Sequence, residues 1–253
     1  MGALHEGHIA LVNEARVNCD LVICSIFINP LQFHDLQDLE NYPRRLEQDR
    51  EMLEASGCDL LFTPEKEELF ADLKERAYDL GGLDDHWEGP LRPGHFQGVV
   101  NVVERLFFYV RPDLAYFGEK DRQQLMILQH VARQQLWPEK IIGRPTVREA
   151  DGAALSSRNS RLDPSDRKKL PVLYEALQMV ERRAFDKPVK DIDQDVKELI
   201  GSIDGVDLDY FGIADPVTLA PINTVDDRDD AIALIAARIG PIRVIDNITL
   251  RRK

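Results

Sequence analysis

Cysteine is scarce in this sequence. Its 253 residues include Cys19, Cys24 and Cys58, and no two of them form a C-x-x-C pair. A sparse, odd-numbered set among apolar neighbours argues against a disulfide scaffold and predicts reduced, buried thiols in a reducing compartment. Long apolar runs are also lacking, and the start has no charged segment followed by an apolar core, as a signal peptide would have. We therefore expect a cytoplasmic protein that does not cross a membrane.

Positive charge is scarce as well. The 45 acidic residues outnumber the 32 basic ones, and the formal net charge is -13 at pH 7. This balance argues against general nucleic-acid binding and against binding to anionic membranes. It remains compatible with an anionic small-molecule substrate, because a locally basic pocket fits within an acidic protein. The densest acidic run, residues 226–230, is typical of a solvated loop, with metal binding as the alternative.

Short apolar runs alternate with helix-length segments over the first 150 residues. The runs are rich in β-branched residues and are typical of strands buried on both faces, as in a parallel sheet. This alternation predicts an α/β fold with a Rossmann-like parallel sheet. We expect strands at residues 21–28, 60–63, 115–117 and 141–148, and helices at about 9–17, 46–55 and 99–109.

The pattern changes near Pro164. A long helix over about 164–184 and an amphipathic helix over about 188–200 precede three strand-like segments, which predicts a smaller α+β C-terminal domain. We place the two domains at residues 1–146 and 147–253. A charged stretch over 65–98 interrupts the first domain and resembles a mobile excursion or lid, as long loops in compact domains often are. The expected C-terminal strands are residues 208–213, 231–238 and 243–248.

The first eight residues, Met1 to His8, form the first candidate site. A glycine-bearing turn there leads into the first expected helix, and the unpaired N–H groups and dipole of a helix N-terminus favour an anion. His5 and His8 are three residues apart and would face the same way on a first helical turn. The pattern predicts a phosphate site; the alternative is a helix start with two surface histidines.

Polar side chains follow two of the expected strands. Asn29 and Gln32 come just after the strand at 21–28, at the carboxyl end where open α/β sheets bind ligands, although Asn29-Pro30 is also a turn signal. After the strand at 115–117, Lys120 is suited to neutralise a phosphate, Asp121 to accept from ribose hydroxyls and Gln124 to bond a polar substrate. The alternative for this second group is a charged first turn of a helix.

Two hydroxyls and a guanidinium occur together on the turn at Ser156, Ser157 and Arg158. The serines are suited to donate to phosphate oxygens, and the arginine offers a two-pronged donor for them. The alternative is that the serines cap a helix near residues 164–170.

Taken in order, these motifs resemble the pantothenate synthetase (pantoate–β-alanine ligase) family. The match runs from Met1 to Asn159 and continues more loosely to Asp246-Asn247-Ile248. The remaining matching segments are Ser25–Phe33, Tyr42-Pro43-Arg44, Pro93–Val99, Phe117–Gln124, Pro145–Glu149 and Ser156–Asn159.

The resemblance implies a Rossmann-like nucleotidyltransferase domain followed by a small C-terminal lid domain. It implies a homodimer in coenzyme A biosynthesis that joins pantoate to β-alanine. ATP and Mg²⁺ are the implied cofactors, with Mg²⁺ carried on the phosphates. The reaction passes through a pantoyl adenylate and releases pyrophosphate and then AMP.

The family's site residues carry over position by position. The catalytic set is His5, His8, Lys120 and Arg158. The ATP-binding set is Met1, His5, His8, Gly118, Glu119, Lys120, Asp121, Val147, Leu155, Ser156, Ser157 and Arg158. The pantoate-binding set is Gln32, Gln124, Met1, Asn29 and Phe33. Asp49 is the one protein carboxylate considered for the metal.

Two other functions stay open from the sequence alone. One is a different nucleotidyltransferase with the same histidine turn, although Gln32, Gln124 and Phe33 suit a small branched hydroxy acid better than a phosphate ester. The other is a truncated nucleotide-binding relative with little activity. It stays open because family members carry a strand ahead of the Met1 position, and we expect a chain that lacks this strand to be poorly stable or weakly active.

Overall fold

The computed structural model describes residues 1–32, 39–40, 42–71, 76–225 and 228–252. The chain divides into two compact units. Unit 1 comprises Met1–Asp84 and Glu88–Val147, and unit 2 comprises Asp85–Trp87 and Arg148–Lys253. The division after Val147 lies one residue beyond the boundary expected from the sequence.

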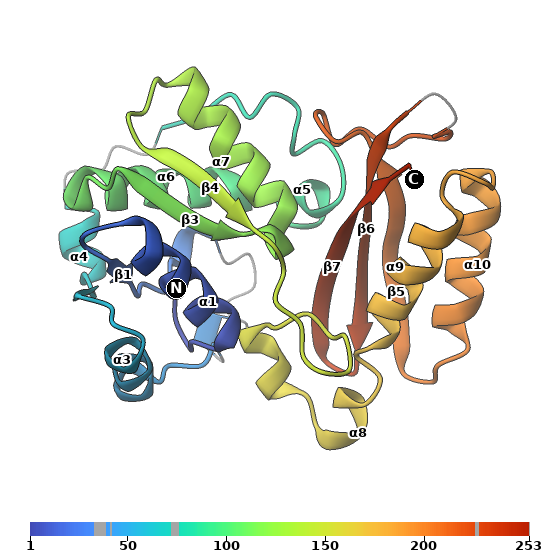
Figure 1. Ribbon diagram of the computed structural model, residues 1–253, viewed down its shortest axis with the longest axis horizontal. Coiled ribbons are helices and arrows are strands. Elements are labelled where there is room, and N and C mark those ends of the chain that lie inside the picture. The colour runs from blue at the N-terminus through green and yellow to red at the C-terminus, as the bar shows by residue number, and fades with distance from the viewer. Residues whose placement is uncertain (33–38, 41, 72–75, 226–227, 253) are drawn as a thin grey trace. The chain divides into compact units, whose positions relative to one another are not determined.

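The described residues of unit 1 form four short strands that pair in parallel, and β3 and β4 lie side by side in Figure 1. β1 (Ile23–Ser25) pairs with β2 (Leu60–Phe62), and β3 (Leu114–Gly118) pairs with β4 (Lys140–Arg144). The described strands of this unit thus form two separate two-stranded sheets. The α/β class is confirmed. β1 is shorter than the apolar run over 21–28, and the run's later residues bond outside the strand, with the Ile26 N–H donating to the Phe62 carbonyl.

Helices connect these strands, as the alternating pattern predicts. α1 (Glu6–Asn18) precedes β1, α3 (Leu46–Ala55) lies between β1 and β2, and α7 (Arg122–Gln134) lies between β3 and β4. α6 (His95–Val110) precedes β3 and buries most of its apolar residues. Shorter helices among the described residues of the unit include η1 (Pro30–Gln32), α4 (Lys66–Leu69), α5 (Glu88–Leu91) and η2 (Glu119–Asp121).

A small apolar cluster holds α1 and α3 against β1. Val12, Val22, Cys24 and Leu53 are buried together there. Burial raises the pKa of the Cys24 thiol to about 11, so this thiol stays protonated at neutral pH. All three cysteines are free, but only Cys24 is buried; Cys19 and Cys58 are half-buried, which corrects the expectation that all three would be buried.

Part of the segment over 65–98, which was expected to be a mobile excursion, is held by side-chain hydrogen bonds. Three amide side chains of α6 and α7 form hydrogen bonds of 2.8–3.0 Å with its backbone and so satisfy polar groups that have no strand partner there. The part of the segment at 76–88 is therefore a fixed strap. The Asn101 amide bonds the backbone N–H and carbonyl of Arg76, and the Gln97 amide bonds those of Tyr78. The Gln123 amide bonds the Leu83 carbonyl and the Glu88 N–H.

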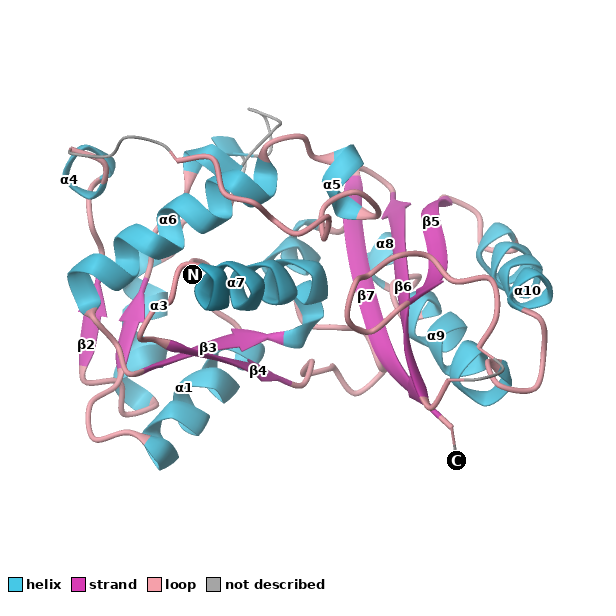
Figure 2. Ribbon diagram, turned by 90° about the horizontal axis from the view of Figure 1, so that it is seen from above, coloured by secondary structure: helices cyan, strands magenta, loops and turns pink. Residues whose placement is uncertain are grey.

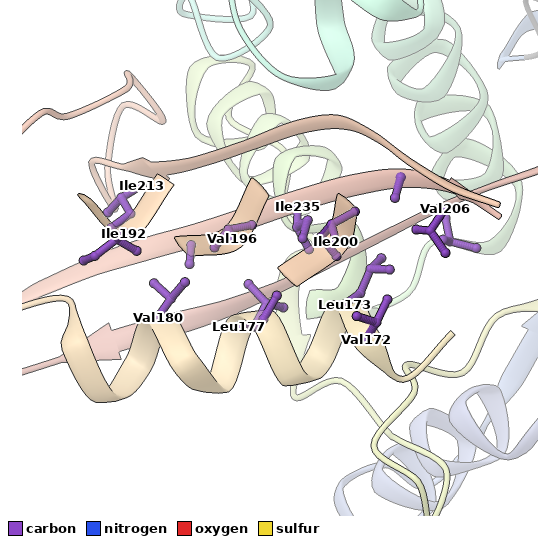
Figure 3. Packing of buried hydrophobic residues seen from close by; sticks show 14 of the residues in the cluster. Val172, Leu173, Leu177, Val180, Ile192, Val196, Ile200, Val206, Ile213 and Ile235 are labelled. Carbon is purple, nitrogen blue, oxygen red and sulfur yellow. The ribbon is translucent and has the colours of Figure 1, made fainter. Parts of the chain in front are cut away.

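Unit 2 is built on an antiparallel sheet of β5 (Val206–Ala214), β6 (Asp230–Ile239) and β7 (Ile242–Arg251), with β6 in the middle (Figure 2). α9 (Val172–Arg183) and α10 (Val189–Gly201) pack on one face of this sheet. Their apolar side chains point at the strands and form the unit's core (Figure 3). Burial of this core accounts for the strong amphipathic pattern of both helices.

The expected single helix over 164–184 is wrong in one respect. It is broken into α8 (Pro164–Arg167) and α9, with turns between them. Pro171 lies at the break, and proline has no N–H to continue a helical ladder. Asp163 begins α8, and its carboxylate accepts the N–H groups of Ser165 and Asp166.

Unit 2 also includes three residues from an earlier part of the sequence, Asp85–Trp87. Of these, Trp87 lies on β5, where its indole ring packs 5.5 Å from the Tyr210 ring and its Nε1–H donates to the Leu219 carbonyl at 2.7 Å. The ring fits because Gly212 beneath it has no side chain; a Cβ there would lie 2.3 Å from the indole. Among the described residues, no helix combines the length and apolar character needed to span a membrane.

Candidate active site

Two histidines define the start of α1. His5 is the N-cap, and its Nδ1 accepts the Gly7 N–H at 3.2 Å; the Nδ1 of His8 accepts the His5 N–H at 3.3 Å. The two rings lie with centroids 4.0 Å apart. A ring nitrogen that accepts a hydrogen bond carries no proton, so each imidazole holds its proton on Nε2. The turn thus presents two neighbouring Nε2–H donors.

The surroundings of His8 keep its imidazole neutral. Burial lowers the pKa of His8 well below its usual value, and the neighbouring His5 ring and the Met1 amine lower it further. Asp121 acts in the opposite direction, and Lys120 adds to the lowering. The start of α1 and the Lys120–Asp121 turn therefore lie within electrostatic reach of each other. A neutral imidazole can donate one hydrogen bond and carries no fixed positive charge.

The turn before α1 is fixed by backbone contacts. The Met1 amine donates to the Ser25 carbonyl at 2.8 Å, and the Met1 carbonyl accepts the Phe27 N–H at 3.1 Å, so Met1 lies beside Ile26 in parallel register. Burial lowers the pKa of the Met1 amine. Ala3 has a φ of +49°, in the left-handed region that residues other than glycine seldom adopt. The turn is therefore held against a local backbone preference.

Lys120 and Asp121 lie in η2, directly after β3. The Lys120 Nζ is 3.3 Å from the Asp121 carboxylate, and the Lys120 side chain is 19 % exposed. Gly118 precedes them, and a Cβ at this position would meet no atom within 4 Å, so Gly118 borders open space. Glu119, expected at the ATP site, pairs with Arg122 at 3.1 Å. The carboxyl end of β3 thus offers a cation beside an open region.

The two glutamines that follow have different surroundings. Gln123 is buried, and its amide is bonded to the strap at 76–88. Gln124, the expected pantoate contact, is half-buried on the first turn of α7. Gln123 thus has a structural role, whereas Gln124 is the residue that the family motif assigns to pantoate.

Asn29 has a structural role. Its side chain is 2 % exposed, its Nδ2 donates to the Gly98 carbonyl at 3.0 Å, and its Oδ1 accepts the Leu31 N–H at 3.1 Å. These bonds join the end of the β1 segment to α6 and shape η1, which carries Gln32. The side chain of Gln32 and all of Phe33, two other expected pantoate contacts, lie outside the described part of the structure.

In unit 2, the expected phosphate-binding turn opens η3 (Ser157–Arg161). The Ser156 hydroxyl caps this helix by accepting the Arg158 N–H, so the capping alternative holds for the adjoining short helix and not for α8. Asn159 anchors the turn by donating to the Ala154 carbonyl at 2.9 Å. Ser156, Ser157, Arg158 and the preceding Leu155 are all half-buried.

A charged pair supports the backbone next to this turn. Arg148 binds both oxygens of Asp246 at 2.6 and 3.0 Å and lies 3.9 Å over the Tyr174 ring. It also donates to the Gly152 carbonyl at 3.1 Å. Two parallel hydrogen bonds and a stacked ring fix the guanidinium in one orientation. Val147, the expected adenosine contact, is the residue directly before Arg148 and belongs to unit 1.

The described residues include no group of three or more histidine, cysteine or carboxylate side chains arranged to hold a metal ion. Asp49, the carboxylate considered for the metal, instead accepts the backbone N–H groups of Ala3 and Leu4. No pattern in the sequence signals this contact, because the partners are 45 and 46 residues apart. The strap amides did leave a signal, since Gln97 and Asn101 lie four residues apart on a helix that is mostly apolar.

The sequence model of one family, described as pantoate-beta-alanine ligase, matches residues 1–249. The chain belongs to the pantoate–β-alanine ligase family. A pantothenate synthetase of Thermus thermophilus is 45% identical over 250 residues, which cover 98% of this chain and 90% of that protein. The pantothenate synthetase of Rubrobacter xylanophilus is 44% identical over 259 residues, covering 99% and 89%.

Solved structures of the family agree with this. A crystal structure of the Thermus thermophilus pantothenate synthetase superposes with a TM-score of 0.92 at 44% identity and covers 98% of this chain and 90% of that one. The ligase from Francisella tularensis, complexed with β,γ-ATP and β-alanine, gives 0.79 at 32% identity, with 98% and 86% covered. The α/β class and the C-terminal antiparallel sheet are thus those of the pantoate–β-alanine ligases.

Proposed function

We propose that this chain joins pantoate to β-alanine with cleavage of ATP, giving pantothenate, AMP and pyrophosphate. Family membership over residues 1–249 supports the reaction. The observation that carries it is the pair of imidazoles at the start of α1: the Nδ1 atom of each accepts a backbone N–H, and His8 lies within electrostatic reach of Lys120. Donors held in place before the reaction are what a developing phosphate charge requires.

The first step forms the mixed anhydride. A carboxylate oxygen of pantoate attacks the α-phosphorus of ATP, the bond from that phosphorus to the bridging oxygen breaks, and pyrophosphate leaves. Negative charge grows on the phosphate oxygens during this step. His5, His8 and Lys120 supply hydrogen-bond donors and a cation for it, and no side chain becomes covalently attached.

The second step forms the amide. The amine nitrogen of β-alanine attacks the acyl carbon of the pantoyl adenylate, the carbon–oxygen bond to AMP breaks, and the nitrogen releases a proton. The same donors stabilise the departing AMP phosphate. Water has to be kept out between the steps, because an acyl adenylate hydrolyses readily.

The remaining assignments follow the family motif position by position. Asp121 accepts from the ribose hydroxyls, and Val147 with the Gly118 backbone lines the adenosine pocket. Gln32 and Gln124 bond the hydroxyl and carboxylate of pantoate, while Met1 and Phe33 contact its methyl groups. In unit 2, the Ser156, Ser157 and Arg158 turn, with Leu155 beside it, binds the outer phosphates of ATP.

Mg²⁺ belongs to the substrate in this proposal. It enters as MgATP, because Mg²⁺ prefers oxygen ligands, keeps several waters and is commonly bound through substrate phosphates. A homodimer and a cytoplasmic location complete the proposal.

A product assay tests the function. Purified protein is incubated with MgATP, pantoate and β-alanine, and pantothenate, AMP and pyrophosphate are quantified together. The proposal predicts equal amounts of the three products and none when pantoate is omitted. Formation of ADP and phosphate, or nucleotide transfer to a phosphorylated acceptor in place of pantoate, would contradict it.

A further inference from the structure

Asp49 is a buried carboxylate whose two oxygens both bind the same short turn. Its side chain lies on α3 and is 2 % exposed. Oδ2 accepts the Ala3 N–H at 2.9 Å, and Oδ1 accepts the Leu4 N–H at 2.7 Å. A buried charge persists only where hydrogen bonds compensate for lost hydration, and these two N–H groups supply that compensation.

The shape of the turn explains why a carboxylate is needed. Ala3 is in the left-handed conformation, with φ at +49°. Consecutive N–H groups around a left-handed residue point to one side and form a concave anion-binding arrangement. The carboxylate of Asp49 is the anion in this arrangement. Without it, the two N–H groups would be left unpaired near buried surroundings, and the turn would relax towards a more common backbone conformation.

The turn that Asp49 holds leads directly into the histidines. Leu4 directly precedes His5 in the chain. His5 is the N-cap of α1, and its own N–H donates to the His8 Nδ1. The orientation of each imidazole thus depends on backbone that begins at the two N–H groups bound by Asp49. A displacement of Ala3 and Leu4 would move the Nε2–H donors of both histidines away from the reacting phosphate.

We infer that Asp49 is a positioning residue for the adenylation step, acting through the Ala3 and Leu4 amides on His5 and His8, and is not a ligand of the metal. This inference rests on the proposed function. Among the described residues, Asp49 belongs to no group of three or more histidine, cysteine or carboxylate side chains arranged to hold a metal ion. Both of its oxygens already accept backbone hydrogen bonds.

The test is Asp49→Asn, which keeps the shape of the side chain but leaves one acceptor oxygen for two N–H groups. Initial rates of pantothenate formation are measured over a range of Mg²⁺ concentrations at saturating substrates. We expect kcat to fall on the order of 10²-fold, as for a displacement of about 1 Å in a catalytic group, with the Mg²⁺ concentration for half-maximal rate unchanged.

The matched control is Asp59→Asn. Asp59 also clamps backbone within unit 1, where its carboxylate accepts the Val22 N–H at 2.7 Å and pairs with Arg16. Asp59 lies at the opposite end of α1 from the histidines. The Asp59→Asn variant should therefore be less stable than the wild type but keep its kcat. Thermal unfolding of both variants separates a global loss of structure from a change at the site.

Two results would overturn the inference while leaving the proposed function intact, because the wild-type protein is assayed in parallel. One is Asp49→Asn with unchanged kcat. The other is a variant whose rate returns to normal at high Mg²⁺, since a raised half-maximal Mg²⁺ concentration is the signature of a lost metal ligand. An inactive wild-type protein would instead contradict the proposed function.

A second variant covers the case in which Asp49→Asn does not fold. Asp49→Glu keeps the charge and both acceptor oxygens but moves the carboxylate by one methylene. The inference predicts a lower kcat at an unchanged half-maximal Mg²⁺ concentration. Full kcat in Asp49→Glu, or a raised Mg²⁺ requirement, would overturn it.

Discussion

Gly98→Ala should impair pantoate use by displacing backbone near the expected pantoate contacts. Gly98 lies on the first turn of α6, where its carbonyl accepts the Asn29 side-chain amide at 3.0 Å. A Cβ at this position would lie 2.3 Å from the Leu31 carbonyl oxygen and 2.6 Å from the Leu31 carbonyl carbon. Both atoms are backbone, so no side-chain rotation relieves the clash.

The size of the displacement follows from these distances. Ordinary contact begins at 3.4 Å, so α6 and η1 must separate by 3.4 minus 2.3, or 1.1 Å. Such overpacking costs about 1–3 kcal/mol of stability. Loss of the Asn29 hydrogen bond adds about 1 kcal/mol. Because Gln32 follows Leu31 directly, a shift of about 1 Å should lower kcat/KM for pantoate on the order of 10²-fold.

The assay is pantothenate formation at varied pantoate concentration and saturating MgATP and β-alanine. Gly201→Ala is the matched control, because a Cβ there meets no atom within 4 Å, and its activity should equal that of the wild type. Wild-type kcat/KM for pantoate in a folded Gly98→Ala protein would refute the argument that this close approach sets the position of η1.

Three further changes test other parts of the structure. Lys120→Ala should lower kcat by about 10²-fold or more in the same assay, as loss of a charge-stabilising donor does, while Lys197→Ala on the exposed face of α10 should not. The fold lowers the pKa of His8 below its usual 6.5, so the unfolded chain binds more protons than the folded one below that pH. The free energy of unfolding should therefore fall on acidification, by up to about 1.4 kcal/mol per pH unit. In His8→Asn, the free energy of unfolding measured in urea should depend less steeply on pH. Leu177→Ala, at a fully buried position in the unit 2 core, should cost about 2–5 kcal/mol in urea unfolding; a loss near zero would contradict the packing described for α9.

The sequence predicted the features that depend on local pattern. The apolar runs located the strands, the amphipathic spacing located α9 and α10, and the glycine-bearing turn with its histidine pair located the start of α1. These features are local because helix periodicity, capping and strand hydrophobicity are properties of adjacent residues. Where a local breaker was overlooked, as at Pro171, the predicted helix was too long.

The long-range contacts could not be predicted in this way. Asn29 is an expected pantoate contact that follows a strand, and its amide also donates to the Gly98 carbonyl, 69 residues away. The carboxylate of Asp49, the residue considered for the metal, accepts two backbone N–H groups 45 and 46 residues away. Spacing along the chain carries no information about such partners, because they meet only in the folded unit.

The segment over 65–98 shows the same limit. Its charge and its two adjacent glycines suggested mobility. The backbone at 76–88 is nevertheless bonded to Gln97, Asn101 and Gln123, so it acts as a strap. Composition describes what a loop exposes to solvent, and it does not reveal which neighbouring helix offers it hydrogen-bond partners.

The central claim is that the turn at the start of α1 and Lys120 support formation of a pantoyl adenylate. Exchange of labelled pyrophosphate into ATP, measured without β-alanine, tests it most directly, because the first step alone gives exchange. We predict exchange that requires pantoate and is lost in Lys120→Ala. Exchange that proceeds without pantoate, or its absence in a wild-type protein that binds MgATP and pantoate, would contradict the account.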